Sequence, residues 1–225
     1  MSNISRKLIS SSKKEITISF VTSANADSSS IVIPSSAQEG DLCLFADFPA
    51  AVTSTTPIAP VTPFGVTGWT SLSLYNTLPR NDLAIFSWAK ILGSSDPGSS
   101  VFGTNTATFT GYRRKILVIF RKDAGDVNTF SGPLSLNNQG TNVAPSPQVV
   151  TSASGDSPLI SFGLYRCTQP LYLPSFIPTQ DGIVSSGTTV QVRYKIYNSS
   201  PNNINVEMDD GGSSNMLQSF YLELA

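Results

Sequence analysis

The sequence contains no histidine, and this absence excludes several catalytic mechanisms at once. Ser-His-Asp and Cys-His nucleophilic sites, histidine acid–base catalysis and imidazole metal ligands all require that side chain. What remains is a pair of carboxylates of the glycosidase kind, for which Asp181, Asp209 and Asp210 are the candidates. All three lie beside glycines in turn contexts, where aspartate is favoured for backbone reasons alone. We therefore expect no enzymatic activity.

Other chemical devices are scarce as well. The two cysteines, Cys43 and Cys167, form no disulfide framework and match no zinc spacing. Cys43 lies in an apolar strand pattern and is expected to be a buried free thiol. No Gly-rich phosphate loop joins a strand to a helix. The turn at residues 209–212 has acidic side chains but lacks the spaced oxygen ligands of a calcium loop. We expect neither a cofactor nor a bound metal.

Charge and long apolar runs are also in short supply. Charged residues make up 13% of the chain, against roughly 25% in typical soluble domains, and the formal net charge is −1. Such a chain has no global field that would attract nucleic acid or an anionic membrane. No stretch approaches the ~20 apolar residues that span a bilayer, and the N-terminus has no apolar run typical of a secretory signal. We expect neither nucleic acid nor membrane as a partner.

The chain is rich in what strands and turns need. Hydrophobic residues make up 40% of it, and Ser, Thr, Asn, Gly and Pro fill much of the rest. Residues 115–120 are apolar on both faces and bracketed by basic residues, which predicts a central strand covered on both sides. Residues 190–197 and 204–209 alternate apolar and polar side chains with period two. The pattern predicts an all-β protein, an antiparallel β-sandwich or jelly roll.

Two segments of the chain resemble each other and suggest a degenerate internal duplication. Residues 33–45 and 150–162 each read as a strand, a small-residue turn with Gly-Asp, and a buried strand. Later, residues 88–92 resemble residues 193–197. We predict an N-terminal arm over residues 1–14 and a single sandwich domain over residues 15–225. The alternative is two tandem sandwiches over residues 15–140 and 146–225.

Two long loops in corresponding places carry the candidate contact residues. The first covers residues 49–68 and is followed by Trp69; the second covers residues 166–187. Proline stiffens both loops, so their aromatic side chains lose little entropy on binding. The candidate contacts with a partner or a glycan are Trp69, Tyr172, Phe176 and Phe64, and Tyr75 is a further aromatic of this kind. The alternative is that these aromatics fold back and close the open ends of the sandwich.

Basic residues gather at two places. Arg113, Arg114, Lys115, Arg121 and Lys122 flank the apolar strand, where they either contact an anionic partner or guard the strand ends against aggregation. Four more lie within residues 6–14, in the predicted arm, which is either a docking segment or an ordinary solvated terminus.

A combination of short motifs over residues 31–122 resembles the virion proteins of tailed bacteriophages. They are Ile-x-Ile-Pro at 31–34, Gly-Asp-Leu at 40–42, Gly-Trp-Thr at 68–70, Lys-Ile followed by Asp-Pro-Gly within 90–98, and an apolar strand after Arg-Arg at 113–114. The resemblance covers the first half well and the second half loosely. It implies a β-sandwich module on the surface of a capsid, tail or fibre, and it carries over no catalytic or binding residue.

The resemblance sets three functional hypotheses in order. The first is a structural part of the virion, such as a capsid decoration or tail component, whose partners are other virion proteins and further copies of the chain. The second is a tail-fibre module that binds a host-surface glycan through aromatic side chains. The third is a glycan-degrading enzyme that uses the carboxylates named above. Fold alone does not separate the three.

Overall fold

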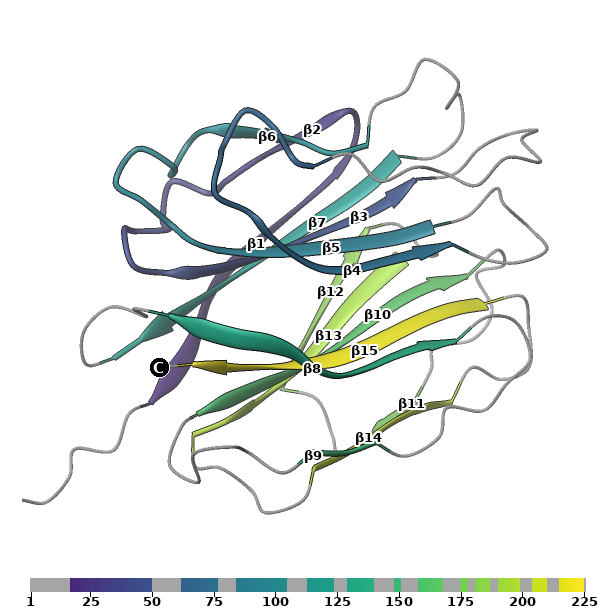
Figure 1. The fold of residues 1–225 in the computed structure, drawn as a ribbon. Coiled ribbons are helices and arrows are strands. Elements are labelled where there is room, and N and C mark those ends of the chain that lie inside the picture. Colours follow the sequence, from purple (N-terminus) through teal and green to yellow (C-terminus); the bar gives the residue numbers. More distant parts are fainter. Residues whose placement is uncertain are drawn as a thin grey trace, which may run out of the picture.

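Two antiparallel sheets of five strands each pack face to face in the computed structural model (Figure 1). In sheet one the strand order is β1 (Ile18–Asp27), β7 (Arg113–Lys122), β3 (Leu42–Pro49), β5 (Ala84–Ile91) and β4 (Thr70–Asn76). In sheet two it is β12 (Gly182–Ser186), β13 (Val190–Tyr197), β10 (Leu159–Cys167), β15 (Asn215–Leu224) and β8 (Phe130–Gln139). The predicted all-β sandwich is confirmed.

Two smaller sheets lie on the outside of this sandwich (Figure 1). Outer layer one, beside sheet one, pairs β2 (Ser30–Val32) with β6 (Ser100–Phe102). Outer layer two, beside sheet two, has the order β11 (Ser175–Ile177), β14 (Ile204–Asp209) and β9 (Gln148–Val150). The structure describes residues 17–49, 62–76, 84–104, 113–123, 129–139, 148–150, 158–167, 175–177, 181–186, 190–198, 204–209 and 215–224. The predicted arm over residues 1–14 lies outside these ranges.

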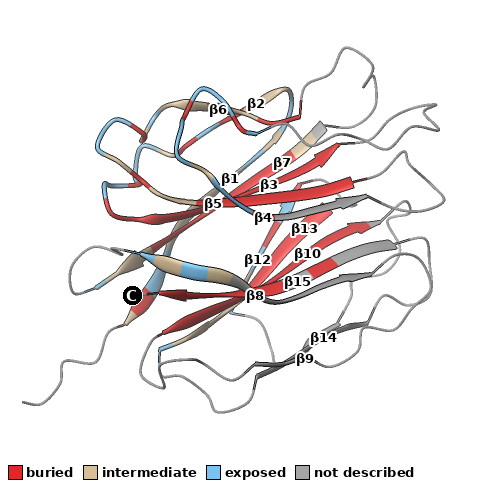
Figure 2. Cartoon of the chain, in the orientation of Figure 1, coloured by how far each residue is buried: buried red, intermediate tan, exposed pale blue. Residues whose placement is uncertain are grey.

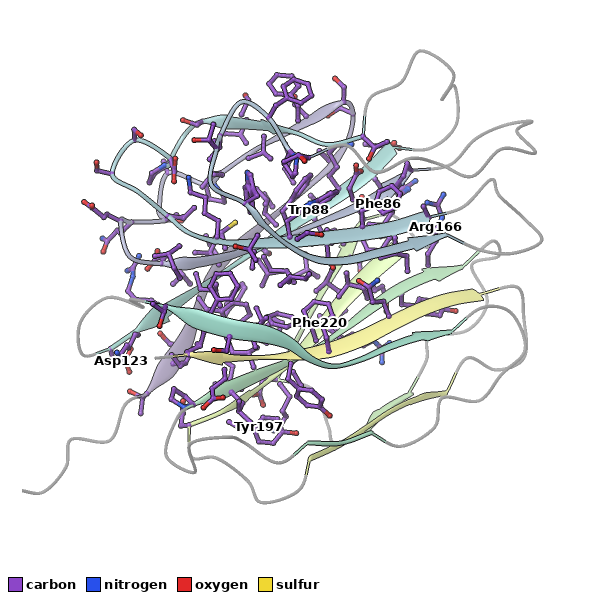
Figure 3. The ribbon with its side chains drawn as sticks, in the orientation of Figure 1. Phe86, Trp88, Asp123, Arg166, Tyr197 and Phe220 are labelled. Carbon is purple, nitrogen blue, oxygen red and sulfur yellow. The ribbon has the colours of Figure 1, made fainter. Side chains whose placement is uncertain are left out.

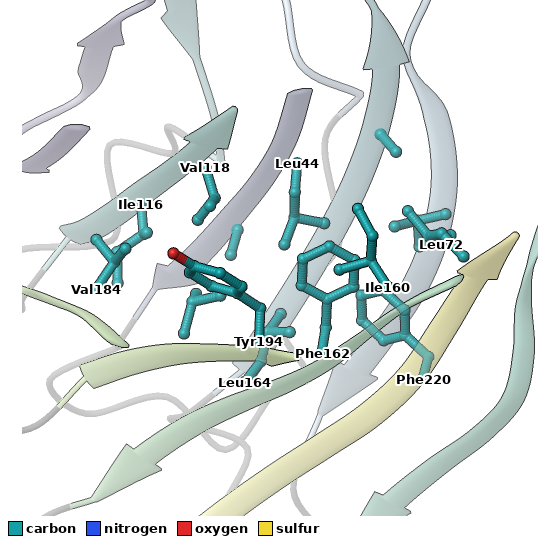
Figure 4. Close-up of a cluster of buried hydrophobic side chains, with 14 of the residues drawn as sticks. Leu44, Leu72, Ile116, Val118, Ile160, Phe162, Leu164, Val184, Tyr194 and Phe220 are labelled. Carbon is teal, nitrogen blue, oxygen red and sulfur yellow. The ribbon is translucent and has the colours of Figure 1, made fainter. Parts of the chain in front are cut away.

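The main core fills the space between sheet one and sheet two. Alternating residues of β3 and β7, such as Leu44 and Val118, point into it from one side (Figure 4). Phe162 and Phe220 come from the other side, with ring centroids 5.4 Å apart. Phe120 meets Phe162 edge-on at 5.6 Å, a favourable geometry for aromatic pairs. Both halves of the chain contribute to this core.

A second core separates sheet one from outer layer one. Phe45 stacks on Trp88 at 5.5 Å, and Ile31 and Val101 cover them from the outer layer. The residues of β7 alternate between the two cores, so this strand is buried on both faces over residues 115–120 (Figure 2). The prediction of a doubly covered central strand is confirmed.

The two halves of the chain have the same strand topology. The order β1-β7-β3-β5-β4 of sheet one is repeated as β8-β15-β10-β13-β12 in sheet two. The outer pair β2-β6 likewise recurs as β9-β14. Each half therefore builds one sheet of the sandwich together with its own outer layer.

The register of the sheets tests the two sequence matches behind the predicted internal duplication. Leu42 lies opposite Ile91 in sheet one, and Ile160 lies opposite Ile196 in sheet two, so residues 88–92 and 193–197 do correspond. The other match, between residues 33–45 and 150–162, does not extend to single residues. Phe45 points into the second core, whereas Phe162 points into the main core. Because side chains alternate with period two, a one-residue slip exchanges the faces of a strand.

Candidate contact surface

The structure places the first predicted contact residue, Phe64, on the outside of outer layer one. Phe64 pairs with Phe102 by two backbone hydrogen bonds of 3.1 and 2.9 Å, so residue 64 adds a single bridge to β6. The two rings stack with centroids 4.9 Å apart and planes at 7°. Phe64 nevertheless keeps 47% of its surface exposed, which is unusual for a large apolar side chain.

A glycine lets the chain approach β6 closely at this point. Gly65 has φ +88°, in the left-handed region, and a Cβ there would collide with the carbonyl oxygen of Ser100. Only glycine meets both conditions without strain. The position of the Phe64 ring is thus fixed by the backbone, and the ring is held on the surface rather than hanging from a free loop.

Val32 extends this surface along β2. It is 51% exposed, whereas its neighbours Ile31 and Ile33 are buried in the second core. Ser30 lies opposite Phe102 and Val32 opposite Ser100, so Val32 and Phe102 are diagonal neighbours on the outer face. We call Val32, Phe64 and Phe102 the outer apolar patch. Strands β2 and β6 contain no charged residue, so no charge interrupts it.

Trp69 has a different environment from Phe64. Its ring packs against the second core, 5.7 Å from Phe45, and its indole N–H donates to the carbonyl oxygen of Val66 at 3.0 Å. It is partly buried, so only part of the side chain is available to a ligand. Trp69 therefore fits the alternative interpretation, in which a loop aromatic covers the core, better than it fits a contact residue.

The predicted contact residues of the second half are less fully described. The second loop is not a single long loop, because it contains β11 and β12. This corrects the prediction of a loop over residues 166–187. In β11, Phe176 lies opposite Met208 of β14, much as Phe64 lies opposite Phe102 in outer layer one. Tyr172 lies outside the described residues, and for Tyr75 in β4 the structure describes the backbone alone.

The three candidate carboxylates are not gathered into one described site. Asp181 precedes β12 and uses both oxygens locally: Oδ1 pairs with Lys195 Nζ at 2.9 Å, and Oδ2 accepts from the Ile196 amide at 2.7 Å. Asp209 ends β14, in outer layer two, and Asp210 lies outside the described residues. The contacts of Asp181 are those of a residue that closes the end of a strand.

Three basic residues of β7 form ion pairs with carboxylates in or beside the adjacent strands. Lys115 is fully buried and pairs with Asp47 Oδ1 at 3.1 Å. Arg121 donates from Nε and Nη2 to the two oxygens of Asp41, both at 2.8 Å, and this hydrogen bonding raises the pKa of Arg121. Arg114 lies 3.6 Å from Asp27. These pairs hold the strands together.

A cleft of about 350 Å³ opens between the edges of the two sheets. It is lined by Gly68, Thr70, Lys90, Ile91, Thr129, Phe130 and Gly132, which come from β4, β5 and β8 or from the residues beside them. Lys90 Nζ is held by Asp96 Oδ2 at 2.8 Å and by the carbonyl oxygen of Thr67 at 2.5 Å. The cleft combines one aromatic ring with hydroxyl groups and a fixed ammonium.

Cys43 is the buried free thiol that the sequence predicts. Burial is the main cause that raises the pKa of this thiol, and the nearby Asp96 acts in the same direction.

In the described residues, no cluster of Cys, Asp and Glu could hold a metal ion. The same part of the chain contains no helix with the length and apolarity to cross a membrane.

Sequence reasoning missed the role of one surface residue and misplaced one buried residue. It gave no role to Phe102, because β6 is only three residues long and follows a Gly-Ser-Ser turn. It also counted Lys115 among the strand-end charges, although the register with Asp47 buries it.

Comparisons of the chain with protein-family models, curated proteins and solved structures found no match.

Proposed function

We propose that the chain is a non-enzymatic structural component of a phage virion, on the surface of the capsid or tail. It acts through loop and edge contacts with neighbouring virion proteins and with copies of itself. The observation that carries this proposal is the outer apolar patch. Its stacked rings and Val32 are held in place, uncharged and accessible, and such surfaces mark protein interaction sites. Aromatic side chains are also the usual anchors of interfaces.

Two further observations support the proposal. The motifs that resemble virion proteins fall within residues 31–122, the part of the chain that contains the outer apolar patch and every strand of sheet one except β1. Several acidic and basic side chains in the described ranges, such as Asp41 and Arg121, are paired inside the fold. These charges stabilise the fold, and the outer apolar patch offers uncharged side chains for contact with a partner.

A binding experiment on particles tests the role of the outer apolar patch. Particles that lack the protein are incubated with purified chain, and the bound fraction is measured by co-sedimentation over a range of concentrations. We expect Phe64→Ala to weaken binding at least about tenfold, as loss of an interface anchor does. Ile183→Ala removes an equally exposed side chain, 44% against 47%, from another sheet and should leave binding unchanged. Equal binding of both variants would contradict the role of the patch.

The cleft between the sheet edges favours a second candidate function, binding of a host-surface glycan. The cleft places the Phe130 side chain next to Thr70, Thr129 and Lys90, so an apolar ring lies beside hydroxyl groups and an ammonium, a combination that suits a sugar. A ligand that binds only the folded state stabilises it by about 2.7 kcal/mol at 100 times its Kd. Thermal melts across a broad glycan set test this function. If no glycan raises the melting temperature, the glycan-binding candidate fails.

A further inference from the structure

Strand β1 is a long, uncharged edge strand. It forms one edge of sheet one, and within the described residues its only strand partner is β7 (Figure 1). It is ten residues long, contains no proline, and has no charged side chain before Asp27. Natural proteins usually protect such edges with lysine, proline or short strands, because a bare edge is a template for another strand. This edge lacks those protections.

The two edges of sheet two are better protected. Strand β8, an edge of sheet two, contains Pro133 and two register irregularities against β15. Strand β12, the opposite edge of sheet two, is only five residues long. The one irregularity in β1 falls between Phe20 and Thr22, so the stretch from Thr22 to Ala26 is a regular strand.

The register fixes which backbone groups of β1 face outward. The Asp123 amide donates to the carbonyl oxygen of Thr17, which makes residues 17 and 123 a hydrogen-bonded pair. In an antiparallel ladder such pairs alternate, so Ile119, Leu117 and Lys115 of β7 also direct their backbone groups toward β1. Their partners are Thr22, Ala24 and Ala26. The N–H and C=O groups of Ser23 and Asn25 consequently point away from the sheet.

We infer that this edge is the interface between two copies of the chain. The two β1 strands run antiparallel across a two-fold axis at Ala24, so that Ser23 of each copy exchanges both backbone hydrogen bonds with Asn25 of the other. Ala24 of one copy then lies opposite Ala24 of the other copy, and Thr22 lies opposite Ala26. All are small side chains that tolerate the close approach of a non-hydrogen-bonded pair. Asp27 of each copy lies opposite Val21, so no like charges meet across the axis. The pairing is isologous, the commonest form of dimer.

The inference names one partner within the proposed function and rests on it. The experiment measures the mass of the full chain in solution by light scattering and sedimentation at micromolar concentrations. We expect twice the chain mass of 23.9 kDa. Ser23→Pro removes an outward N–H at a position where an edge strand tolerates proline, and Asn25→Lys adds an edge charge. Both variants should sediment as monomers with an unchanged circular dichroism spectrum. Ser71→Lys changes an exposed residue of β4, the opposite edge, and should remain dimeric.

A crosslinking experiment tests the register independently of folding effects. In a Cys167→Ser background, Ala24→Cys brings two thiols together across the two-fold axis, within the Cα separation that a disulfide accepts. Mild oxidation should convert it to a covalent dimer. Ala26→Cys lies on the same face of the same strand but opposite Thr22 of the other copy, so it should stay uncrosslinked.

Three results would overturn the inference: a wild-type monomer at all concentrations, a Ser23→Pro variant that remains dimeric, or equal crosslinking of both cysteine variants. None of these results bears on particle binding through the outer apolar patch. The failure of this inference can therefore be told from the failure of the proposed function.

Discussion

The buried pair between Lys115 and Asp47 gives a prediction about the stability of the fold. Both side chains have no exposed surface, and Lys115 Nζ lies 3.1 Å from Asp47 Oδ1. The other carboxylate oxygen accepts from the Thr104 amide at 2.6 Å, which ties the residues after β6 to sheet one. Lys115→Met keeps an unbranched apolar stem of similar volume but removes the ammonium. Asp47 is then left as a buried anion without its ammonium partner, and it keeps the Thr104 amide as a donor.

Breaking a buried ion pair in this way costs about 3–5 kcal/mol. For a chain of this size, each kcal/mol lowers the melting temperature by roughly 2–4 °C, so the loss should be roughly 6–20 °C. Equilibrium unfolding in urea measures the free energy directly. The double variant Asp47→Asn with Lys115→Met should be more stable than Lys115→Met alone, because it no longer buries an unpaired charge.

The result that would refute this reasoning is a loss below about 1 kcal/mol for Lys115→Met, the range of exposed ion pairs. Such a value would mean that water reaches the pair in solution and that outer layer one does not seal it. A double variant no more stable than the single one would also contradict it, because the cost would then come from packing rather than from charge.

Three further predictions follow from buried groups. Gly103→Ala should destabilise the fold by about 1–3 kcal/mol in urea unfolding, because its Cβ would collide with the fixed carboxylate of Asp47; a neutral effect would show that the carboxylate can move. Tyr197 ends strand β13 of sheet two (Figure 3). Burial raises its pKa to about 12, so the folded state favours the neutral phenol over the phenolate. Stability is therefore full below the ordinary tyrosine pKa of about 10 and falls as pH rises toward 12. Tyr197→Phe should flatten that fall in unfolding experiments, and an unchanged slope would assign it to other groups. In a Cys167→Ser background, Cys43 should react with a thiol reagent only as fast as the protein unfolds, and rapid reaction in native buffer would contradict its burial.

The strand pattern was predictable from the sequence where strands are long. Residues 190–197 alternate cleanly, and residues 116–120 are apolar on both faces, so period and composition suffice. Short strands such as β6 carry no such signal, because three residues cannot show a period. Strand β8 contains Pro133, which sequence reasoning counts against a strand but which an edge strand accepts.

The candidate surface was only partly predictable for a related reason. Phe64 was named because it follows prolines in a long loop, yet its exposure depends on the pairing with Phe102, a contact between residues 38 positions apart. Lys115 looked like a strand-end charge, and only the register between β3 and β7 shows that it lies opposite Asp47. The internal repeat was visible in the sequence, but its alignment needed the register of the sheets.

The central claim is that the chain is a part of the phage particle that acts through its surface. Antibody labelling of intact particles, viewed by electron microscopy, tests it most directly, with particles that lack the protein as the control. The account predicts regular labelling on the particle: over the head for a capsid component, or confined to the tail or fibres for a tail component. Complete absence of label from intact particles, with the protein detected only in the infected cell, would contradict it.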